Sequence, residues 1–515
     1  MCGIAGYYGL DFISKNKLDK TLGLMKNRGP NASGIIKKNI KQKKLYLLHS
    51  RLSIIDLKKR SDQPYIYKNL LLIFNGEIYN YIELKNDLIK KGYEFKTNSD
   101  TEVLIKSIEC FGEKVFDKLE GMWAFAIFDL KKNKLVLSRD RFGEKPLYYR
   151  KDKYGIYFGS EPKYIQSLFK KKLKPNLEKC KDFLSYGYNS FALNDHSFIE
   201  TIKKINPSTN LIIDKKNILK KKKYWSLSSI KIDKSLNLKK HISEIRKKLI
   251  YAIKIRLRSD VKDAFYLSGG VDSGTIVSIC KKIFNKKIES YSIFQKNNKQ
   301  YDESLIIKKM SKITRSKNYN IDASKINILK SLNEMVSYYN APVLTLNNLA
   351  QSLLCKKMSK KKIKVVFSGV GSDEIFSGYY DHYLHHLSDL KKTKFFFENR
   401  QYWEKNVKKY IRNPKLKNEK LPASRLHFIK KFDFLFKKSK ILKIKTTKKI
   451  LQSHLKTALI HQFKENLEPL LYAEDLNSMK YSIENRSPFL DKNLAEKLFS
   501  INPRFFIQKG YAKYL

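Results

Sequence analysis

Two glycine-rich segments combine small, hydroxyl-bearing and acidic residues in a pattern suited to binding phosphate. They are residues 268–273, Ser-Gly-Gly-Val-Asp-Ser, and residues 368–374, Ser-Gly-Val-Gly-Ser-Asp-Glu. Glycines let the backbone approach a ligand, and a helix N-terminus offers unpaired N–H groups to an anion. A carboxylate beside phosphate repels it unless a cation such as Mg²⁺ lies between them. We therefore predict a phosphate site in which Asp272 and Asp373 bind the metal, although Asp373 alone would also suit a helix cap.

A second centre of chemistry is predicted at the N-terminus, where Cys2 follows the initiator methionine. If Met1 is removed, which a small second residue permits, Cys2 carries a thiol and a free α-amine. The amine has an ordinary pKa of about 8, so it can serve as the base for its own thiol. Taken alone, Cys2 would also fit a buried structural role, which is common for free cysteine.

Strands and helices that alternate along the second half of the chain would position the glycine-rich segments. Helical spacing of apolar residues predicts helices over 242–257 and 274–283. The apolar runs that predict strands are 263–266, 288–294, 317–321 and 364–367. This alternation is typical of a doubly wound parallel sheet, which binds ligands at the carboxyl ends of its strands. Both glycine-rich segments follow such strands directly.

The first half of the chain contains apolar strands that end in polar turns. The informative segments are 1–9, 27–34, 49–56, 71–80, 98–102, 138–149 and 159–163. Together, over roughly residues 2–200, they resemble the glutaminase domain of the class II, N-terminal-nucleophile amidotransferases. The resemblance implies a four-layer αββα fold that hydrolyses glutamine to glutamate and ammonia.

The same resemblance implies roles for individual residues of the first half. Cys2 would attack the side-chain amide, and Asn75 with the Gly76 backbone N–H would stabilise the oxyanion, typically worth ~3 kcal/mol per donor. Arg51 would pair with the α-carboxylate of glutamine, for which a guanidinium fork is well shaped. The implied glutamine-binding residues are Arg51, Leu52, Ser53, Ile54, Ile55, Asn75, Gly76, Glu77 and Asp100.

Some of these residues also have simpler interpretations. Glu77 and Asp100 would receive the α-ammonium of glutamine, but Asp100 by itself could be only a helix cap. Arg51 by itself could be only a surface charge. The charged segment 139–146 matches the family too, and we interpret it as a structural brace near the domain junction.

The segment 268–273 resembles the pyrophosphate loop of the ATP-pyrophosphatase family, which adenylates a carboxylate or carbonyl group. Combined with 368–374, it resembles the synthetase domain of the glutamine-hydrolysing asparagine synthetase family. The implied ATP-binding residues are Leu267, Ser268, Gly269, Gly270, Asp272, Ser273, Ile293, Ser368 and Gly369. Residues 475–491 also match the family, and we interpret them as a helix and turn that shape the acceptor site.

The chain departs from this family in two places. Many members have a glutamate, implicated in forming the acyl-adenylate, where this chain has Val370. The family also continues past Leu515, and its further segment normally holds a lysine that steadies the departing pyrophosphate. We therefore expect the chain to be truncated at its C-terminus, either as a fragment or as a protein with an impaired synthetase half.

These observations predict a ligase of two domains, with a glutaminase domain at 2–200, a linker at 201–240 and an ATP-binding domain at 241–515. Ammonia from glutamine would pass inside the protein to an acyl-adenylate made from ATP and a carboxylate, most simply aspartate, giving asparagine, AMP and pyrophosphate. The cofactors implied are ATP and Mg²⁺. Two alternatives stay open, namely an amidotransferase for a sugar acid or other carboxylate, and a glutaminase with an impaired synthetase half.

Composition excludes several other classes. The formal net charge is +57, but the lysines are spread over the chain, as a general compositional bias would place them, so no nucleic-acid partner is expected. No apolar run approaches the ~18 residues that a membrane span requires. Five scattered cysteines without a CxxC motif indicate a reducing, cytoplasmic location. A homodimer stays open, because the sequence does not reveal the oligomeric state.

Overall fold

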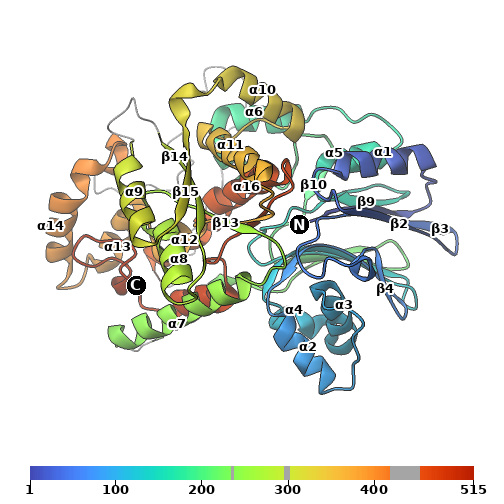
Figure 1. Cartoon of the computed structure of the whole chain (residues 1–515), viewed down its shortest axis with the longest axis horizontal. Coiled ribbons are helices and arrows are strands. Elements are labelled where there is room, and N and C mark those ends of the chain that lie inside the picture. The colour runs from blue at the N-terminus through green and yellow to red at the C-terminus, as the bar shows by residue number, and fades with distance from the viewer. Residues whose placement is uncertain (234–236, 295–301, 418–452) are drawn as a thin grey trace.

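The computed structural model describes residues 1–233, 237–294, 302–417 and 453–515 (Figure 1). Its N-terminal half contains two six-stranded sheets in which every neighbouring pair is antiparallel. In spatial order the first sheet is β10 (Lys203–Lys204), β8 (Tyr148–Lys151), β9 (Gly155–Gly159), β1 (Gly3–Gly9), β3 (Lys43–Arg51) and β2 (Ala32–Ile40). The second is β12 (Leu219–Lys223), β11 (Thr209–Ile213), β7 (Lys134–Arg139), β6 (Gly121–Asp129), β5 (Leu70–Ile78) and β4 (Tyr65–Tyr67).

Side-chain alternation along the strands stacks these sheets between two helical layers. On β1, Ile4 and Tyr8 pack between the sheets against Leu71. Tyr7 points the opposite way and packs with Leu18 of a helix. The outer layers contain α1 (Lys15–Met25) and α5 (Pro162–Leu168) on the first sheet, and α2 (Tyr81–Ile89) and α3 (Asp100–Phe111) on the second. The predicted four-layer αββα fold is confirmed.

The C-terminal half is built on a five-stranded sheet in which every pair is parallel. Its spatial order is β15 (Lys317–Asp322), β14 (Glu289–Phe294), β13 (Asp263–Tyr266), β16 (Val365–Phe367) and β17 (Glu484–Arg486). Helices cover both faces, with α7 (Leu238–Arg256) and α8 (Val271–Lys282) on one and α11 (Leu346–Lys360) on the other. The predicted doubly wound sheet is confirmed. Sequence analysis missed β17, because Glu-Asn-Arg carries no apolar signal.

The order of this sheet reverses between β13 and β16. From β13 the chain continues to β14 and β15 on one side, and β16 then begins on the other side. Ligands of doubly wound sheets bind at such a switch point, beyond the carboxyl ends of the strands. Both glycine-rich segments follow these two strands, so the fold brings them to one edge.

Part of the predicted linker is folded into the glutaminase half. Within 201–240, the strands β10, β11 and β12 pair with sheets of that half, and residues 234–236 lie outside the described residues. Residues 220–223 lie in the edge strand β12, where all four lysines are exposed. A solvated edge strand of lysines has the composition of a linker, so composition alone misassigned it.

The remaining helices surround these two cores. They are α4 (Val115–Lys118), α6 (Leu177–Tyr186), α9 (Ser304–Ile313), α10 (Ile328–Tyr339), α12 (Ser372–Phe376), α13 (Tyr380–Leu390), α14 (Phe396–Asn406), α15 (His454–Gln462), α16 (Glu468–Met479) and α17 (Lys492–Ser500). Across the described ranges, no helix is both long enough and apolar enough to cross a membrane.

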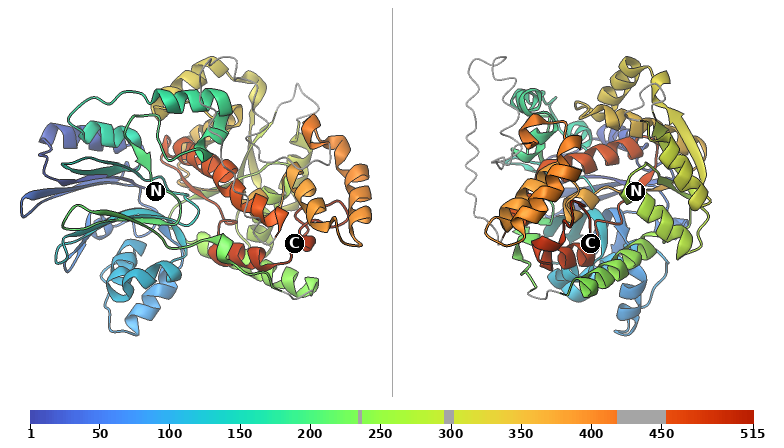
Figure 2. Two further views of the ribbon diagram at one scale, coloured as in Figure 1. Left: turned by 180° about the vertical axis from the view of Figure 1, so that it is seen from behind. Right: turned by 90° about the vertical axis from the view of Figure 1, so that its left-hand side faces the viewer.

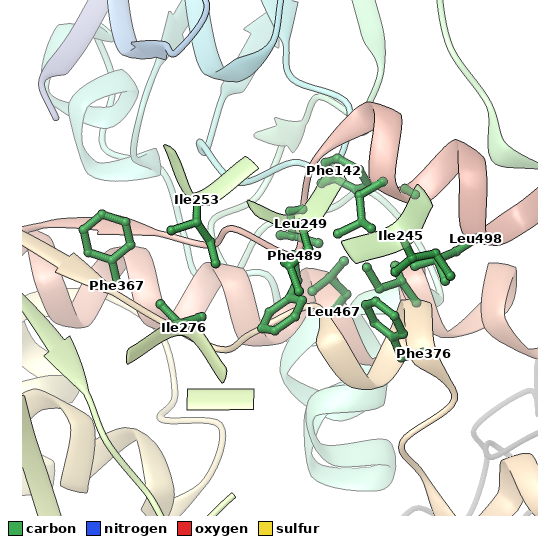
Figure 3. Close-up of a cluster of buried hydrophobic side chains, with 14 of the residues drawn as sticks. Phe142, Ile245, Leu249, Ile253, Ile276, Phe367, Phe376, Leu467, Phe489 and Leu498 are labelled. Atoms are coloured by element: carbon green, nitrogen blue, oxygen red, sulfur yellow. The ribbon is translucent and has the colours of Figure 1, made fainter. Parts of the chain in front are cut away.

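The two halves meet along α16, which lies beside the N-terminus (Figures 1 and 2). Arg28 of the glutaminase half donates to both carboxylate oxygens of Asp475 on this helix, at 2.7 and 3.0 Å. One apolar cluster also spans the junction, since Phe142 packs with Leu467 and Phe489 (Figure 3). The junction is therefore a buried, packed interface.

The charged segment 139–146 lies at this junction, as the sequence analysis proposed. Arg139 donates to the carbonyls of Gly143 and Lys145 at 2.8 Å and lies 3.4 Å from Glu468 of α16. Asp140 accepts hydrogen bonds from four backbone N–H groups of residues 142–145. The structural interpretation is confirmed, but these charges hold mainly backbone groups, not one another.

Candidate active sites

The predicted nucleophile lies beside its predicted oxyanion donor. The backbone N–H of Cys2 donates to Asn75 Oδ1 at 2.9 Å, and both residues are buried. Asn75 Nδ2 is also buried and has no hydrogen-bond partner among the described residues. A buried amide donor without an acceptor is costly unless a ligand supplies one. Its position beside Cys2 therefore fits a site where negative charge develops on a substrate oxygen.

The N-terminus itself is part of this site. Met1 is buried, and its ammonium group pairs with Glu484 of β17 at 3.0 Å. Burial raises the pKa of the Cys2 thiol, while the nearby terminal ammonium acts in the opposite direction. Removal of Met1, as predicted, would turn the Cys2 nitrogen into the free amine that activates the thiol.

Gly76 has a steric reason to be glycine. It pairs with Trp123 across β5 and β6, and a Cβ there would lie 2.0 Å from the Met122 carbonyl oxygen. The two strands could not approach this closely with any larger residue. Gly76 is thus fixed one residue after Asn75, which fits its predicted role as the second oxyanion donor.

Two buried carboxyl groups lie near the nucleophile. Asp100 Oδ2 accepts the backbone N–H of Ile78 at 2.9 Å, and burial raises the pKa of Asp100 to about 6. Burial, followed by Glu484 and Asp100, raises the pKa of Glu77 well above its ordinary value. Ser99 caps α3, accepting the Glu102 N–H at 3.3 Å, so the alternative role of Asp100 as the cap is wrong. These acids are available to receive an ammonium group.

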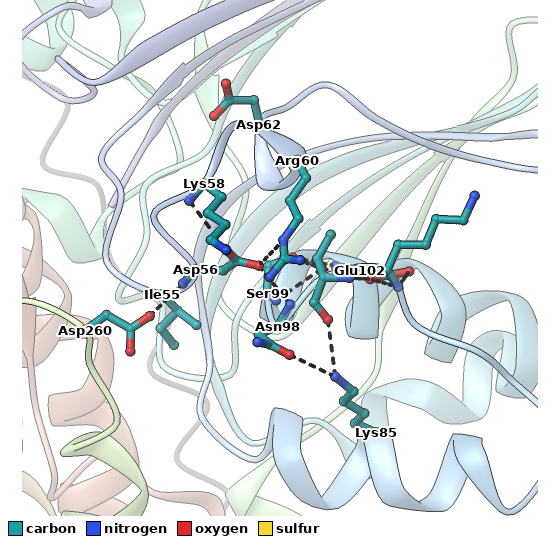
Figure 4. A network of polar contacts seen from close by, with 12 residues as sticks. Ile55, Asp56, Lys58, Arg60, Asp62, Lys85, Asn98, Ser99, Glu102 and Asp260 are labelled. Carbon is teal, nitrogen blue, oxygen red and sulfur yellow. Dashed lines mark hydrogen bonds and ion pairs between the residues drawn. The ribbon is translucent and has the colours of Figure 1, made fainter.

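Arg51 is buried, so its interpretation as a surface charge is wrong. Its guanidinium donates to Asp62 at 2.8 Å and to the carbonyls of Lys58 and Ile55 at 3.0 and 3.2 Å. These contacts hold the loop over residues 55–62, part of which Figure 4 shows. Leu52, Ile54 and Ile55 are buried and Ser53 is half-buried. Whether Arg51 also reaches glutamine stays a prediction.

A bridge from this loop reaches the other half of the molecule. The backbone N–H of Asp56 donates to Asp260 at 2.9 Å, and the Asp56 carboxylate accepts from the Asn98 N–H at 2.8 Å and from Arg60 at 3.1 Å (Figure 4). Hydrogen bonds outweigh burial here and lower the pKa of Asp56. The loop over residues 55–62 is therefore tied to the segment that leads into β13.

The loop after β13 presents donors to an anion. α8 begins at Val271, three residues before the predicted start at Gly274, and Ser268 N–H donates to Ser273 Oγ at 3.0 Å. Gly269 N–H donates to the carboxylate of Glu303 at 2.8 Å, which shows that this N–H is oriented toward a negative group. Ser268 and Gly270 are exposed. The loop fits phosphate binding, and Glu303 is a contact that sequence analysis missed.

The two predicted metal ligands converge on a single cation of the chain. Lys513 Nζ lies 2.7 Å from both carboxylate oxygens of Asp272 and 2.6 Å from Asp373. Ser372 also donates to Asp272 at 2.8 Å. Burial alone would lower the pKa of Lys513, but Asp373 and Asp272 raise it above its ordinary value. Because one ammonium group fits between the two carboxylates, the donor set also suits a divalent cation.

Lys513 corrects an expectation from the sequence. A lysine of the phosphate site was expected only beyond Leu515, yet Lys513 reaches both glycine-rich segments from the last residues of the chain. Sequence analysis missed it because 241 residues separate it from Asp272 and no local motif marks it.

Four of the predicted ATP-binding residues lie at or beside the ends of three strands, and they are Leu267, Ile293, Ser368 and Gly369. Leu267 N–H donates to the Tyr291 carbonyl at 3.0 Å, and its own carbonyl accepts from Ser292 at 2.6 Å. A Cβ on Gly369 would lie 2.9 Å from the Cβ of Asp272, so the two loops touch. Val370 is half-buried and packs against the main apolar cluster. The fold brings these segments together, and their contacts with ATP stay a prediction.

Two family descriptions match the chain, one in each half. Residues 1–225 match a glutamine amidotransferase domain. Residues 244–515, more than half of the chain, match asparagine synthase. The chain belongs to the asparagine synthase family. This confirms the resemblance drawn from the two glycine-rich segments and from the N-terminal motifs.

Curated relatives agree with this assignment. A putative glutamine-hydrolysing asparagine synthetase of Methanocaldococcus jannaschii is 33% identical over 74% of this chain and 76% of the relative. A glutamine-hydrolysing asparagine synthetase of Bacillus subtilis is 30% identical over 74% of this chain, which spans 59% of that relative. An amidase of Gibberella zeae is 28% identical over 70% of this chain and 55% of the relative.

Among solved structures, a B. subtilis glutamine phosphoribosylpyrophosphate amidotransferase aligns with a TM-score of 0.34 and 14% identity. The alignment covers 68% of this chain and 92% of that chain.

Proposed function

We propose that this chain transfers nitrogen from glutamine to the β-carboxylate of aspartate, with ATP as the activating substrate. The products would be asparagine, glutamate, AMP and pyrophosphate. The observation that carries the proposal is the convergence of Asp272, Asp373 and Lys513 at the switch point of the parallel sheet. A buried Cys2–Asn75 pair in the other half supplies the matching nitrogen chemistry.

The first half-reaction follows from the residues around Cys2. The thiolate attacks the amide carbon of glutamine, and the carbonyl oxygen that becomes negative is stabilised by Asn75 Nδ2 and the Gly76 N–H. Collapse releases ammonia, and water then frees glutamate from the sulfur. Glu77 and Asp100 hold the α-ammonium of the substrate. Free ammonia at neutral pH is mostly ammonium, which is not nucleophilic, so a route inside the protein preserves its reactivity.

The second half-reaction makes the acceptor carboxylate reactive. The carboxylate attacks the α-phosphate of ATP, and pyrophosphate leaves with its electron pair. Lys513 neutralises charge on the departing pyrophosphate. Mg²⁺, when bound by Asp272 and Asp373, would shield the phosphates from these carboxylates. The N-terminal end of α8, which follows the first glycine-rich segment, would stabilise phosphate oxygens.

A labelling experiment tests the proposal. Glutamine labelled with ¹⁵N in its amide is supplied with ATP, Mg²⁺ and aspartate, and the product is identified by mass spectrometry. We expect ¹⁵N-asparagine with one AMP and one pyrophosphate for each molecule formed. Label that remains in free ammonia while AMP is absent would reject the proposal and favour the glutaminase with an impaired synthetase half. The presence of Lys513 supports a working synthetase half.

A different acceptor is the second candidate, and Val370 favours it. Many family members have an acid at this position, whereas Val370 presents an apolar side chain that packs into the core. The same assay run with a panel of sugar acids distinguishes the candidates. Amidation of a sugar acid with no asparagine would identify the second function.

A further inference from the structure

One buried carboxylate near the synthetase site has no assigned role. Glu474 of α16 accepts hydrogen bonds from Ser368 Oγ at 2.9 Å, Gln351 Nε2 at 3.0 Å and Asn485 Nδ2 at 2.6 Å. All three donors are neutral. Within the described ranges, no lysine or arginine forms an ion pair with Glu474. Burying a carboxylate without a neighbouring cation destabilises the folded state. This indicates that Glu474 has a role other than stabilising the fold.

On one side, Glu474 is close to the glutaminase centre. Its donor Asn485 belongs to β17, immediately after Glu484, whose carboxylate pairs with the Met1 ammonium. The next residue of α16, Asp475, binds Arg28 of the glutaminase half. Glu474 therefore lies on the side of the synthetase domain that faces the source of ammonia.

On the other side, Glu474 is one hydrogen bond from the ATP loops. Ser368 opens the second glycine-rich segment, and its hydroxyl donates to Glu474 while accepting the Val370 N–H at 3.2 Å. The following residue, Gly369, contacts Asp272. Ser368 thus connects Glu474 to the place where an acyl-adenylate would form.

The surroundings raise the pKa of this carboxyl group above its ordinary value. Burial raises the pKa of Glu474 to about 7, although hydrogen bonds from Ser368, Asn485 and Gln351 act in the opposite direction. The charged or titratable groups facing it are Lys145 from the junction segment, Tyr266 at the end of β13 and Cys355 on α11. Burial raises the pKa of Tyr266 and of Cys355, the latter to about 12, so both stay neutral.

We propose that Glu474 accepts, through the Ser368 hydroxyl, the proton that ammonia loses when it attacks the activated acceptor. As the N–C bond forms, the nitrogen becomes positively charged and donates a proton to Ser368 Oγ, whose own proton moves to the Glu474 carboxylate. The C–O bond to AMP then breaks, and AMP leaves with the electron pair. Glu474 would thereby supply a carboxylate that this chain lacks at Val370. The inference rests on the synthetase activity proposed above.

The test compares Glu474→Gln, which keeps the shape and loses the base, with the wild type. Three rates are measured: glutamate release, exchange of labelled pyrophosphate into ATP with the acceptor, and amide formation. We expect the first two to stay within about twofold and amide formation to fall at least about 100-fold, the usual contribution of a positioned general base. Glu474→Asp should recover part of the loss. Leu470→Ala, a change on the exposed face of the same helix, should leave all three rates unchanged.

A pH profile separates proton transfer from a structural role. Amide formation by the wild type should rise as pH increases through about 7, when Glu474 loses its proton. This increase with pH should be absent in Glu474→Gln. The inference is overturned if the increase with pH persists in Glu474→Gln. It is also overturned if pyrophosphate exchange falls as much as amide formation in that variant. A wild-type protein that forms no amide with any acceptor would instead refute the proposed function itself.

Discussion

The two catalytic centres are built in opposite ways. Around Cys2 the side chains are buried, and each polar group is fixed by a strand register or a backbone contact, as Asn75 and Gly76 are on β5. Around Asp272 the loop is open, and Val271 at the start of α8 is 71% exposed. The first centre is thus buried within the fold. The second is an open edge suited to a large, highly charged nucleotide.

The difference also lies in how charge is balanced. Near Cys2, Glu77 and Asp100 lie in a buried environment that raises the pKa of each. At the ATP edge, Lys513 compensates Asp272 and Asp373 from a distant part of the chain. The predicted nucleophile and the predicted metal ligands belong to different halves, although the Met1 ammonium of the first centre pairs with Glu484 of the other half. The two should therefore fail independently when single residues are changed.

The largest effect is expected at the nucleophile. Cys2→Ala should lower glutamine-dependent amide formation by at least about 10⁴-fold, because no other group can form the thioester. Amide formation from added ammonium salt should stay within about threefold. Cys180→Ala, which removes a half-buried cysteine of α6, should change neither rate. Glutamine-driven turnover that survived in Cys2→Ala would show that the nucleophile is assigned wrongly.

The next largest effect is expected at the open edge. Asp272→Ala should lower AMP production by about 10³-fold while glutamate release continues, since the glutaminase half does not use this carboxylate. Lys513→Met should lower AMP production at least about 100-fold, whereas Lys509→Met at a nearby exposed site should have little effect. AMP release is measured by chromatography. Unchanged AMP output in Asp272→Ala would exclude a role in binding metal or phosphate.

A smaller loss is expected when one oxyanion donor is removed. Asn75→Ala should lower kcat for glutamine hydrolysis by about 10²- to 10³-fold, the range found for single donors of this kind. Ammonia-dependent synthesis should be unaffected, and Asn39→Ala on the exposed edge strand β2 serves as the control. A change in KM with an unchanged kcat would instead indicate that Asn75 only binds glutamine.

The smallest effect on chemistry, but a clear one on folding, is expected at the junction. Arg28→Met leaves Asp475 buried without its cation, whereas Glu161 keeps Lys163, and the change should lower the free energy of unfolding by about 3–5 kcal/mol. Lys222→Met breaks an exposed pair with Glu113 and should cost no more than about 1 kcal/mol. Urea denaturation measures both. Equal losses of unfolding free energy in the two variants would show that burial does not increase the contribution of the Arg28–Asp475 pair to stability.

Local sequence signals predicted most of the framework. The run 263–266 was predicted as a strand and forms β13 over those residues, and the following helix begins where the glycines end. Such segments are predictable because apolar periodicity and glycine placement act over a few residues. The β12 edge strand was taken for linker because its lysines give no apolar signal, and β17 was missed for a similar reason.

By itself, the sequence determined the family, the αββα and doubly wound halves, and the identity of the candidate nucleophile and phosphate loops. Only the tertiary structure decided which distant groups complete the sites. It brought Lys513 to Asp272, Glu474 to Ser368 and Arg28 to Asp475, pairs that are 241, 106 and 447 residues apart. Contacts at such separations depend on how strands and helices pack, and no local pattern in the chain encodes them.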